Sequence, residues 1–157
     1  TPPFGHNNVF ATLEETIAHY STTEFNDSSN AGRSMPGTII LTETQVNQIG
    51  ALLRVLNALQ NIEQVIDCGK QVLNGGSLGK SRRALPLCMV DNQDAIDVLD
   101  SGPLAPLHPV AQTHLQNSLD LHDQAIAATS IEERDTALLA AAAELNAAAD
   151  DMAIVPE

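Results

Sequence analysis

The sequence contains two cysteines whose type and spacing suggest chemistry. Cys68 and Cys88 are its only cysteines, and they form no Cys-x-x-Cys pair, so a zinc site is not expected. In an exported protein we expect them to form a disulfide, and closing a loop of about 20 residues would stabilise the fold by about 3 kcal/mol. The alternative is two buried free thiols.

Histidines and aspartates in the second half of the chain are side chains of the types found in metal sites. His114 and His122 are about two helical turns apart and would share a face, whereas His108 lies among prolines. No carboxylate pattern joins them to a known metal motif, so we interpret them as surface or hydrogen-bonded core histidines. A stripe of aspartates lacks the spacing of a calcium loop and is typical of a solvated face: Asp91, Asp94, Asp97 and Asp100.

The charge and hydropathy of the chain exclude several classes of partner. Its 157 residues carry a net charge of −13, from 20 acidic and 7 basic side chains, so nucleic acid phosphates would be repelled. Hydrophobic residues make up 43% of the sequence, but no apolar run reaches the roughly 18 residues that a membrane span needs. An acidic surface is compatible with a basic protein partner such as a small cytochrome.

Short-range signals predict the elements of the first half. Residues 1–11 contain prolines, a glycine and an asparagine pair, and are expected to be irregular. Thr12, followed by Glu15 at the capping-box position, predicts a helix from Leu13 to about Tyr20. Residues 21–37 are rich in Ser, Asn and Gly, and predict a surface loop.

A long helix is predicted next. Thr42 and Gln45 form a second capping-box pattern. Helical spacing of apolar residues continues to Asn74, where Gly75-Gly76 ends it. Its first part carries an apolar stripe: Val46, Ile49, Leu52, Leu53, Leu56 and Leu59.

The segment that follows gives weaker signals. Residues 77–90 show no clear pattern beyond a basic cluster of Lys80, Arg82 and Arg83. Asp91 predicts the cap of a helix to about Leu99. Residues 101–109 contain three prolines and predict a linker.

Two long helices are predicted to close the chain. The first runs from about Pro109 to Ala128, and the second begins at Ser130, with Glu133 at the capping-box position. Because the connection is short, the two should pack antiparallel. The first presents Leu115, Leu119, His122 and Ile126 on one face; the second presents Ile131, Leu138, Leu145 and Met152, flanked by Ala141, Ala142, Ala148 and Ala149. We therefore expect an all-α protein of five or six helices.

Residues 1–59 resemble a known family. The run Thr1-Pro-Pro-Phe-Gly-His-Asn-Asn-Val-Phe-Ala-Thr-Leu-Glu-Glu15 resembles the late segment of the bacterial di-haem cytochrome c peroxidase and MauG-like family. That family runs Thr-x-Pro-[aromatic]-x-His-[Asp/Asn]-Gly-x-x-x-Thr-Leu-Glu-Glu. Leu41–Leu59 is similar to the last helix of the family. The sequence contains no Cys-x-x-Cys-His, the motif that attaches haem c, and residues 60–157 resemble nothing known to us.

The resemblance implies that Tyr20 is an axial ligand of haem iron. In the family, the position fourteen residues after the motif histidine supplies the distal ligand of the electron-transfer haem, and His6 is that histidine here. MauG-like members have Tyr at this position, and peroxidase members have Met. The alternatives are that Tyr20 only fills a core, or that His19 or Met35 is the ligand. Neighbouring helical side chains point about 100° apart, so His19 and Tyr20 cannot both face one iron.

The resemblance assigns three further residues. His6 would lie beside the same haem and its propionates. Thr1 and Pro3 would bind calcium through their main-chain carbonyls, which suit a hard cation. Asn8 stands where the family has Gly, and Asn tolerates the left-handed conformation of that turn.

The resemblance implies that this chain is one portion of a periplasmic or otherwise exported di-haem c oxidoreductase, which is not active alone. Residues 1–60 would form a cytochrome c-like C-terminal segment of a haem domain. A partner chain with Cys-x-x-Cys-His sites would complete that domain and hold haem c covalently. Residues 61–157 would form a helical bundle extension that ends in an antiparallel hairpin. The reaction implied is peroxide-driven oxidation, with electrons from a cytochrome or protein substrate. The alternative is a non-catalytic docking or structural subunit of a cytochrome complex.

Overall fold

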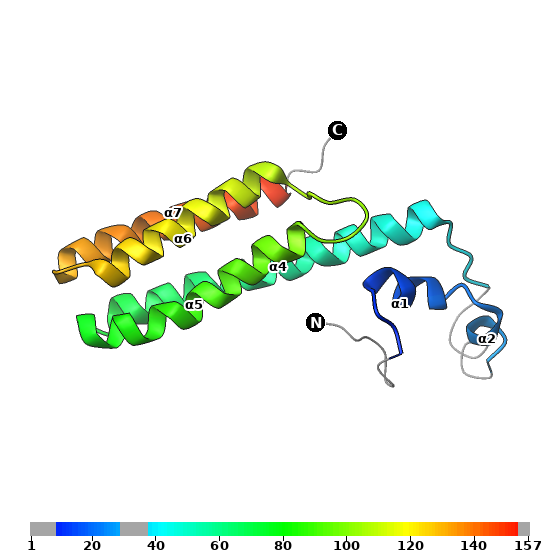
Figure 1. Ribbon diagram of the computed structural model, residues 1–157, viewed down its shortest axis with the longest axis horizontal. Helices are drawn as coiled ribbons and strands as arrows, with labels where there is room; N and C mark the ends of the chain where they lie inside the picture. Colours follow the sequence, from blue (N-terminus) through cyan, green and yellow to red (C-terminus); the bar gives the residue numbers. More distant parts are fainter. Residues whose placement is uncertain (1–8, 29–37, 154–157) are drawn as a thin grey trace. The chain divides into compact units, whose positions relative to one another are not determined.

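The computed structural model describes residues 9–28 and 38–153 (Figure 1). These two ranges contain helices and no strand, which confirms the all-α prediction. The helices are α1 (Leu13–His19), α2 (Thr23–Asn26), α4 (Glu43–Asn74), α5 (Leu78–Leu99), α6 (Pro109–Ala127) and α7 (Ile131–Ala153). Thr1, Pro3, His6 and Met35 lie outside the described residues.

The chain divides into two units. Unit 1 comprises Thr1–Leu53 and Gly102–Leu104, and unit 2 comprises Arg54–Ser101 and Ala105–Glu157. The division falls inside α4, as does the expected boundary after residue 60. Each unit is described by itself below.

Unit 1 begins with the predicted capping box of α1. The Oγ1 of Thr12 accepts the N–H of Glu15 at 3.1 Å, and the Glu15 Oε2 accepts the N–H of Thr12 at 3.3 Å. The one-turn helix α2 follows, capped by Thr22, whose Oγ1 accepts the N–H of Phe25 at 3.2 Å. The prediction of a loop over the whole of residues 21–37 was therefore wrong at α2, because Thr22 satisfies a first-turn amide there.

Side-chain to backbone hydrogen bonds hold unit 1 together. Asn26 donates from Nδ2 to the carbonyl of Ile39 at 3.1 Å, and its Oδ1 accepts the N–H of Ile39 at 2.9 Å. The hydroxyl of Ser21 accepts the N–H of Leu41 at 3.0 Å. These bonds fix the segment that leads into α4 against the α1–α2 region.

The predicted start and end of α4 are confirmed. The Oγ1 of Thr42 accepts the N–H of Gln45 at 3.3 Å, and the Gln45 Oε1 accepts the N–H of Thr42 at 2.9 Å. The helix continues to Asn74. Gly76 then adopts a φ of +66°, in the left-handed region that favours glycine, as the chain turns into α5.

The predicted helix end at about Leu99 is confirmed, but the predicted start at Asp91 was wrong. Residues 78–99 form one helix, α5, so Asp91 lies inside it and caps nothing. Pro86, which removes one helical hydrogen bond and usually signals a break, sits on the exposed side of α5. Leu85 and Cys88 beside it are buried in the bundle. Their packing outweighs the local preference for a break.

Unit 2 is a bundle of the second part of α4 with α5, α6 and α7 (Figure 1). The α6–α7 hairpin is antiparallel, as predicted. The four helices all contribute to each of two apolar clusters. One contains Ala58, Ile62, Val65, Ala95, Leu99, Ala111, Leu115, Leu145, Ala148 and Met152. The other contains Val72, Leu85, Cys88, Ala125, Ala137 and Leu138. Ile131, expected on the buried face of α7, is 46% exposed.

Candidate functional site

An aromatic cluster in unit 1 surrounds Tyr20, the predicted iron ligand. Tyr20 is the C-cap of α1. Its ring meets the ring of Phe25 edge-on, with centroids 4.8 Å apart. The His19 ring lies 5.1 Å from the Phe10 ring and 5.8 Å from the Phe25 ring. Such tilted and edge-on contacts are favourable, so the cluster orients both His19 and Tyr20.

The phenol of Tyr20 is accessible. Its residue is 44% exposed, and its hydroxyl makes no hydrogen bond to any described residue. A buried tyrosine normally finds a partner for its hydroxyl. Within the described part of the chain, Tyr20 therefore does not play the alternative role of filling a core.

His19 is less accessible than Tyr20. It is half-buried, with its ring between those of Phe10 and Phe25. The His19 and Tyr20 ring centroids are 6.2 Å apart, with an angle of 64° between the ring planes. Of these two adjacent candidate ligands, Tyr20 is the more exposed residue.

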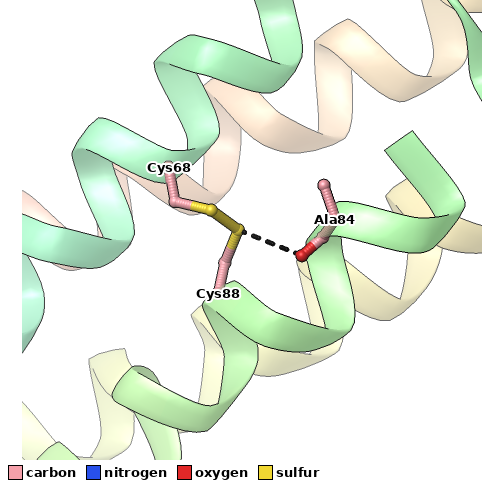
Figure 2. Close-up of a disulfide and its surroundings, with 3 residues drawn as sticks. All are labelled: Cys68, Ala84 and Cys88. Atoms are coloured by element: carbon pink, nitrogen blue, oxygen red, sulfur yellow. Dashed lines mark hydrogen bonds between the residues drawn. A yellow bond between two sulfur atoms is a disulfide. The ribbon is translucent and has the colours of Figure 1, made fainter. Parts of the chain in front are cut away.

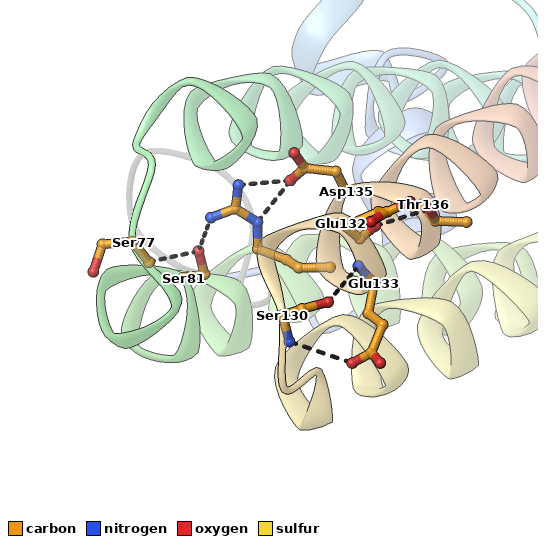
Figure 3. A network of polar contacts seen from close by, with 8 residues as sticks. Ser77, Ser81, Ser130, Glu132, Glu133, Asp135 and Thr136 are labelled. Carbon is orange, nitrogen blue, oxygen red and sulfur yellow. Dashed lines mark hydrogen bonds and ion pairs between the residues drawn. The ribbon is translucent and has the colours of Figure 1, made fainter.

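A buried arginine in unit 2 was missed by the sequence reading. Arg134 is fully buried. It donates from Nε and Nη2 to the Asp135 Oδ1 at 2.8 and 2.6 Å, and from Nη1 to the Ser81 Oγ at 3.0 Å (Figure 3). Ser81 in turn donates to the carbonyl of Ser77 at 3.0 Å. The Arg134–Ser81 hydrogen bond joins α7 to the first turn of α5, while the Arg134–Asp135 ion pair lies within α7. The sequence does carry one signal for the burial of Arg134: it lies one helical turn before Leu138, on the buried face of α7.

The predicted cap of α7 lies next to this arginine. The hydroxyl of Ser130 accepts the N–H of Glu133 at 3.1 Å, and the Glu133 Oε2 accepts the N–H groups of Thr129 and Ser130 at 2.9 and 3.3 Å. The bonds from Thr129 and Ser130 lower the pKa of the Glu133 carboxyl. The capping box predicted from Ser130 and Glu133 is therefore confirmed.

His122 is a core histidine. It is 1% exposed, and its Nδ1 lies 2.7 Å from the carbonyl oxygen of Ser118. A carbonyl only accepts, so Nδ1 carries the hydrogen and donates it. Burial lowers the pKa of His122, against a smaller raising effect from the Ser118 bond. The neutral imidazole is the form suited to this core.

His114 lies apart from His122, at a partly exposed position between α6 and α7. Its Nδ1 is 2.6 Å from the Glu144 Oε2, and its Nε2 is 3.7 Å from the Asp151 Oδ2. The hydrogen bond from His114, and then one from Asn117, lowers the pKa of the Glu144 carboxyl. The two ring nitrogens face different carboxylates and cannot converge on one ion. Across residues 9–28 and 38–153, no group of three such side chains is placed to hold a metal.

The remaining candidate residues lie at a helix end or on an exposed helix face. His108 is the N-cap residue of α6, with a left-handed φ of 47°. Asp94, Asp97 and Asp100 are exposed on α5 and at its end, as expected for a solvated face.

The two cysteines form a disulfide, which confirms the predicted pairing (Figure 2). The bond links α4 to α5, with Cα atoms 5.9 Å apart. Beside it lies a cavity of about 230 Å³, whose lining residues come from the α4–α5 hairpin: Cys68, Gln71, Val72, Gly75, Lys80, Ser81 and Ala84. The sequence reading did not anticipate this cavity.

Comparison with known proteins gives no relative. No family model, curated protein or solved structure matches the chain. Among the described residues, no helix is long and apolar enough to cross a membrane. The resemblance of residues 1–59 to the di-haem family therefore stays a prediction.

Proposed function

We propose that this chain is one portion of a di-haem c oxidoreductase, and that Tyr20 supplies the distal axial ligand to a haem held by another chain. The observation that carries the proposal is the accessible phenol of Tyr20, which is 44% exposed at the end of α1. Phe25 holds the ring at 4.8 Å, while the hydroxyl has no partner among the described residues. A donor that is oriented but unpartnered fits an iron atom.

The residues around Tyr20 give it a defined direction. The Thr12–Glu15 capping box fixes where α1 begins, and the ring of Phe25 fixes the plane of the phenol at its end. Tyr20 would hold the iron through its deprotonated phenol oxygen, a hard anionic donor. Such a ligand stabilises ferric and higher-valent iron and lowers the reduction potential. When bound, haem c would store the oxidising equivalents that the peroxide supplies.

Exposed leucines support completion of unit 1 by another chain. Val46, at the start of the predicted apolar stripe of α4, is buried, but Leu52 is 57% and Leu53 is 41% exposed. Large apolar side chains exposed together are typical of interaction surfaces. The stripe predicted from the sequence is thus only partly covered by the chain itself.

The predicted calcium ligands and the predicted neighbour of the haem stay predictions. Thr1, Pro3 and His6, the residues to which the resemblance assigns these roles, lie outside the described residues. We propose that haem c and calcium are both bound in the complete assembly, and that the assembly is exported.

Purification of the chain with its bound partners tests this proposal. We expect intact mass and haem staining to show a chain with covalent haem in equal amount. Leu52→Asp should release that chain. Leu139→Asp is the matched control, because Leu139 is a similarly exposed leucine (61%). Since Leu139 lies on α7 in unit 2, its substitution should not release the chain. Isolation of a stable assembly without haem would refute the oxidoreductase role.

The alternative, a docking subunit without chemistry, has less support. The Ala-rich face of α7 was expected to receive a partner helix in that case. Ala141 and Ala148 on that face are instead fully buried within unit 2. No other observation favours this second function over the first.

A further inference from the structure

We propose that Cys68 is a site of mixed-disulfide formation with a small anionic thiol, which reaches the Cys68–Cys88 bond through the adjacent cavity. The two sulfurs differ in access. Cys68 is partly exposed and lines the cavity, whereas Cys88 is 1% exposed and belongs to a core cluster. Which sulfur of a disulfide is attacked depends on access, so the incoming thiolate meets Cys68. This inference concerns unit 2 and is independent of the role of Tyr20.

The cavity has room for a small thiol. Its volume is about 230 Å³, several times the roughly 30 Å³ that one water occupies in the liquid. Val72 and Ala84 give it an apolar wall, while Lys80, Ser81 and Gln71 give it polar groups. The lining therefore suits a short carbon chain that carries a charged end.

The local charge favours an anion. The chain has a net charge of −13, yet three of its seven basic side chains fall between residues 80 and 83. Lys80 lines the cavity. Arg82 is engaged elsewhere, because its Nε and Nη2 donate to the carbonyls of Ile126 and Ala128 at 3.1 and 2.8 Å. Lys80 is thus the basic side chain placed to attract an anionic thiol.

One lining residue of the cavity is bonded to a buried guanidinium, which Asp135 neutralises. Ser81, a lining residue that is 2% exposed, accepts a hydrogen bond from the Nη1 of Arg134. The hydroxyl of Ser81 is thereby polarised by a buried guanidinium. Because Ser81 gives its own hydrogen to the carbonyl of Ser77 and Asp135 pairs with Arg134, Lys80 is the group that presents positive charge to the carboxylate of a bound thiol.

The reaction is a thiol–disulfide exchange. The thiolate of the small molecule attacks the Cys68 sulfur, a new S–S bond forms, and the Cys68–Cys88 bond breaks. Cys88 leaves with the electron pair as a thiolate and takes a proton from solvent. No external oxidant or reductant is needed beyond the thiol itself.

The structure provides for the released Cys88. Its Sγ lies 3.5 Å from the carbonyl oxygen of Ala84 (Figure 2). A disulfide sulfur carries no hydrogen, so this is a contact in the oxidised protein. Once the bond is opened, the Cys88 thiol can donate its S–H to Ala84. Cys88 would then remain buried as a thiol while Cys68 carries the adduct.

Three small thiols of different charge test the proposal on the folded full chain. The probes are 3-mercaptopropionate, 2-mercaptoethanol and cysteamine, used at low salt and equal thiolate concentration. Rates of adduct formation are followed by mass spectrometry after acid quench, with peptide mapping. We expect the adduct on Cys68 and the fastest reaction with 3-mercaptopropionate.

Charge-reversal variants locate the effect. Lys80→Glu should lower the rate ratio of 3-mercaptopropionate to cysteamine by about tenfold, on the scale of one Coulomb interaction between fully solvated charges. Lys70→Glu is the matched control, since Lys70 is close in sequence to Cys68 but pairs with Asp67 at 2.8 Å and does not line the cavity. An adduct on Cys88, an equal change in both variants, or reaction only after loss of helicity would overturn the proposal.

Discussion

Unit 1 and unit 2 differ in the kind of side chain that each concentrates. All the phenylalanines and the one tyrosine of the chain fall in the first 25 residues: Phe4, Phe10, Tyr20 and Phe25. Among the described residues, the buried apolar side chains of unit 1 are Ile17 and Val46. Unit 2 has no aromatic residue in its sequence except histidine, yet it forms two aliphatic clusters.

The difference shows two ways of holding a structure together. Unit 2 buries Leu, Ile, Val and Ala from four helices, links α4 to α5 by a disulfide, and pairs a buried Arg134. Unit 1 relies on helix caps and on bonds such as those between Asn26 and Ile39. A small region with little buried apolar surface gains little stability from its own core. We infer that unit 2 maintains its own fold and that unit 1 needs a partner.

The largest effect is expected from Asp135→Ala in unit 2. Removal of this carboxylate leaves the Arg134 charge buried without its counter-charge, which should cost about 3 to 5 kcal/mol of unfolding free energy. Denaturant unfolding followed by circular dichroism measures the loss. Asp150→Ala is the control, because Asp150 is exposed on the same helix. Equal effects of the two substitutions would show that the ion pair does not stabilise unit 2.

Opening the disulfide should have the next largest effect. The double substitution of Cys68 and Cys88 by Ser removes the closure of a loop of about 20 residues, which should lower stability by about 3 kcal/mol. Denaturant midpoints with and without a strong reductant check the value for the parent chain. If reductant leaves the midpoint unchanged, the bond does not contribute to the stability of unit 2.

A smaller and local effect is expected in unit 1. Thr12→Ala removes the acceptor that caps α1 and should cost about 1 kcal/mol. We expect faster hydrogen exchange in α1 and no change in the global unfolding of unit 2. Thr136→Ala is the control, since Thr136 bonds a carbonyl inside α7 rather than capping a helix. If Thr12→Ala lowered the global stability, the two units would be shown to unfold as one cooperative structure.

The pH dependence of stability should come from unit 2 in two windows. Burial lowers the folded pKa of His122 below 6.5, so the unfolded chain binds more protons and stability falls as the pH drops below that value. The bond from His114 lowers the folded pKa of Glu144 below 4.5, so its contribution is present above 4.5 and is lost as the pH falls further. In urea titrations at stepped pH, His122→Gln should flatten the first window, and Glu144→Gln should reduce the second, to which Glu133 also contributes. The same slope in parent and His122→Gln would argue against a neutral buried imidazole.

Features set by neighbouring residues could be predicted from the sequence. The capping boxes at Thr12, Thr42 and Ser130 each need only a partner three residues away. The α6–α7 hairpin followed from apolar spacing and a short connection. The start of α5 was missed, because residues 77–90 show no clear pattern and Asp91 suggests a cap; burial of Leu85 and Cys88 keeps this stretch helical.

Features set by distant residues could not be predicted. The partner of the Arg134 guanidinium on α5, Ser81, is 53 residues away, and no local pattern announces such a bond. The cavity depends on how α4 and α5 are spaced. In unit 1, Tyr20 was a prediction from resemblance, whereas the contact of its ring with Phe25 depends on the unexpected helix α2.

The ferric visible and electron paramagnetic resonance spectra of the haem-bearing assembly, with Tyr20→Phe, test the central claim most directly. Phe keeps the ring packing against Phe25 but has no oxygen donor. We predict loss of the phenolate-to-iron spectrum and a rise in haem potential, since axial ligands set haem potentials over about 0.8 V. His19→Gln should leave both unchanged. An assembly whose spectrum and potential are the same with Tyr20→Phe would contradict the account.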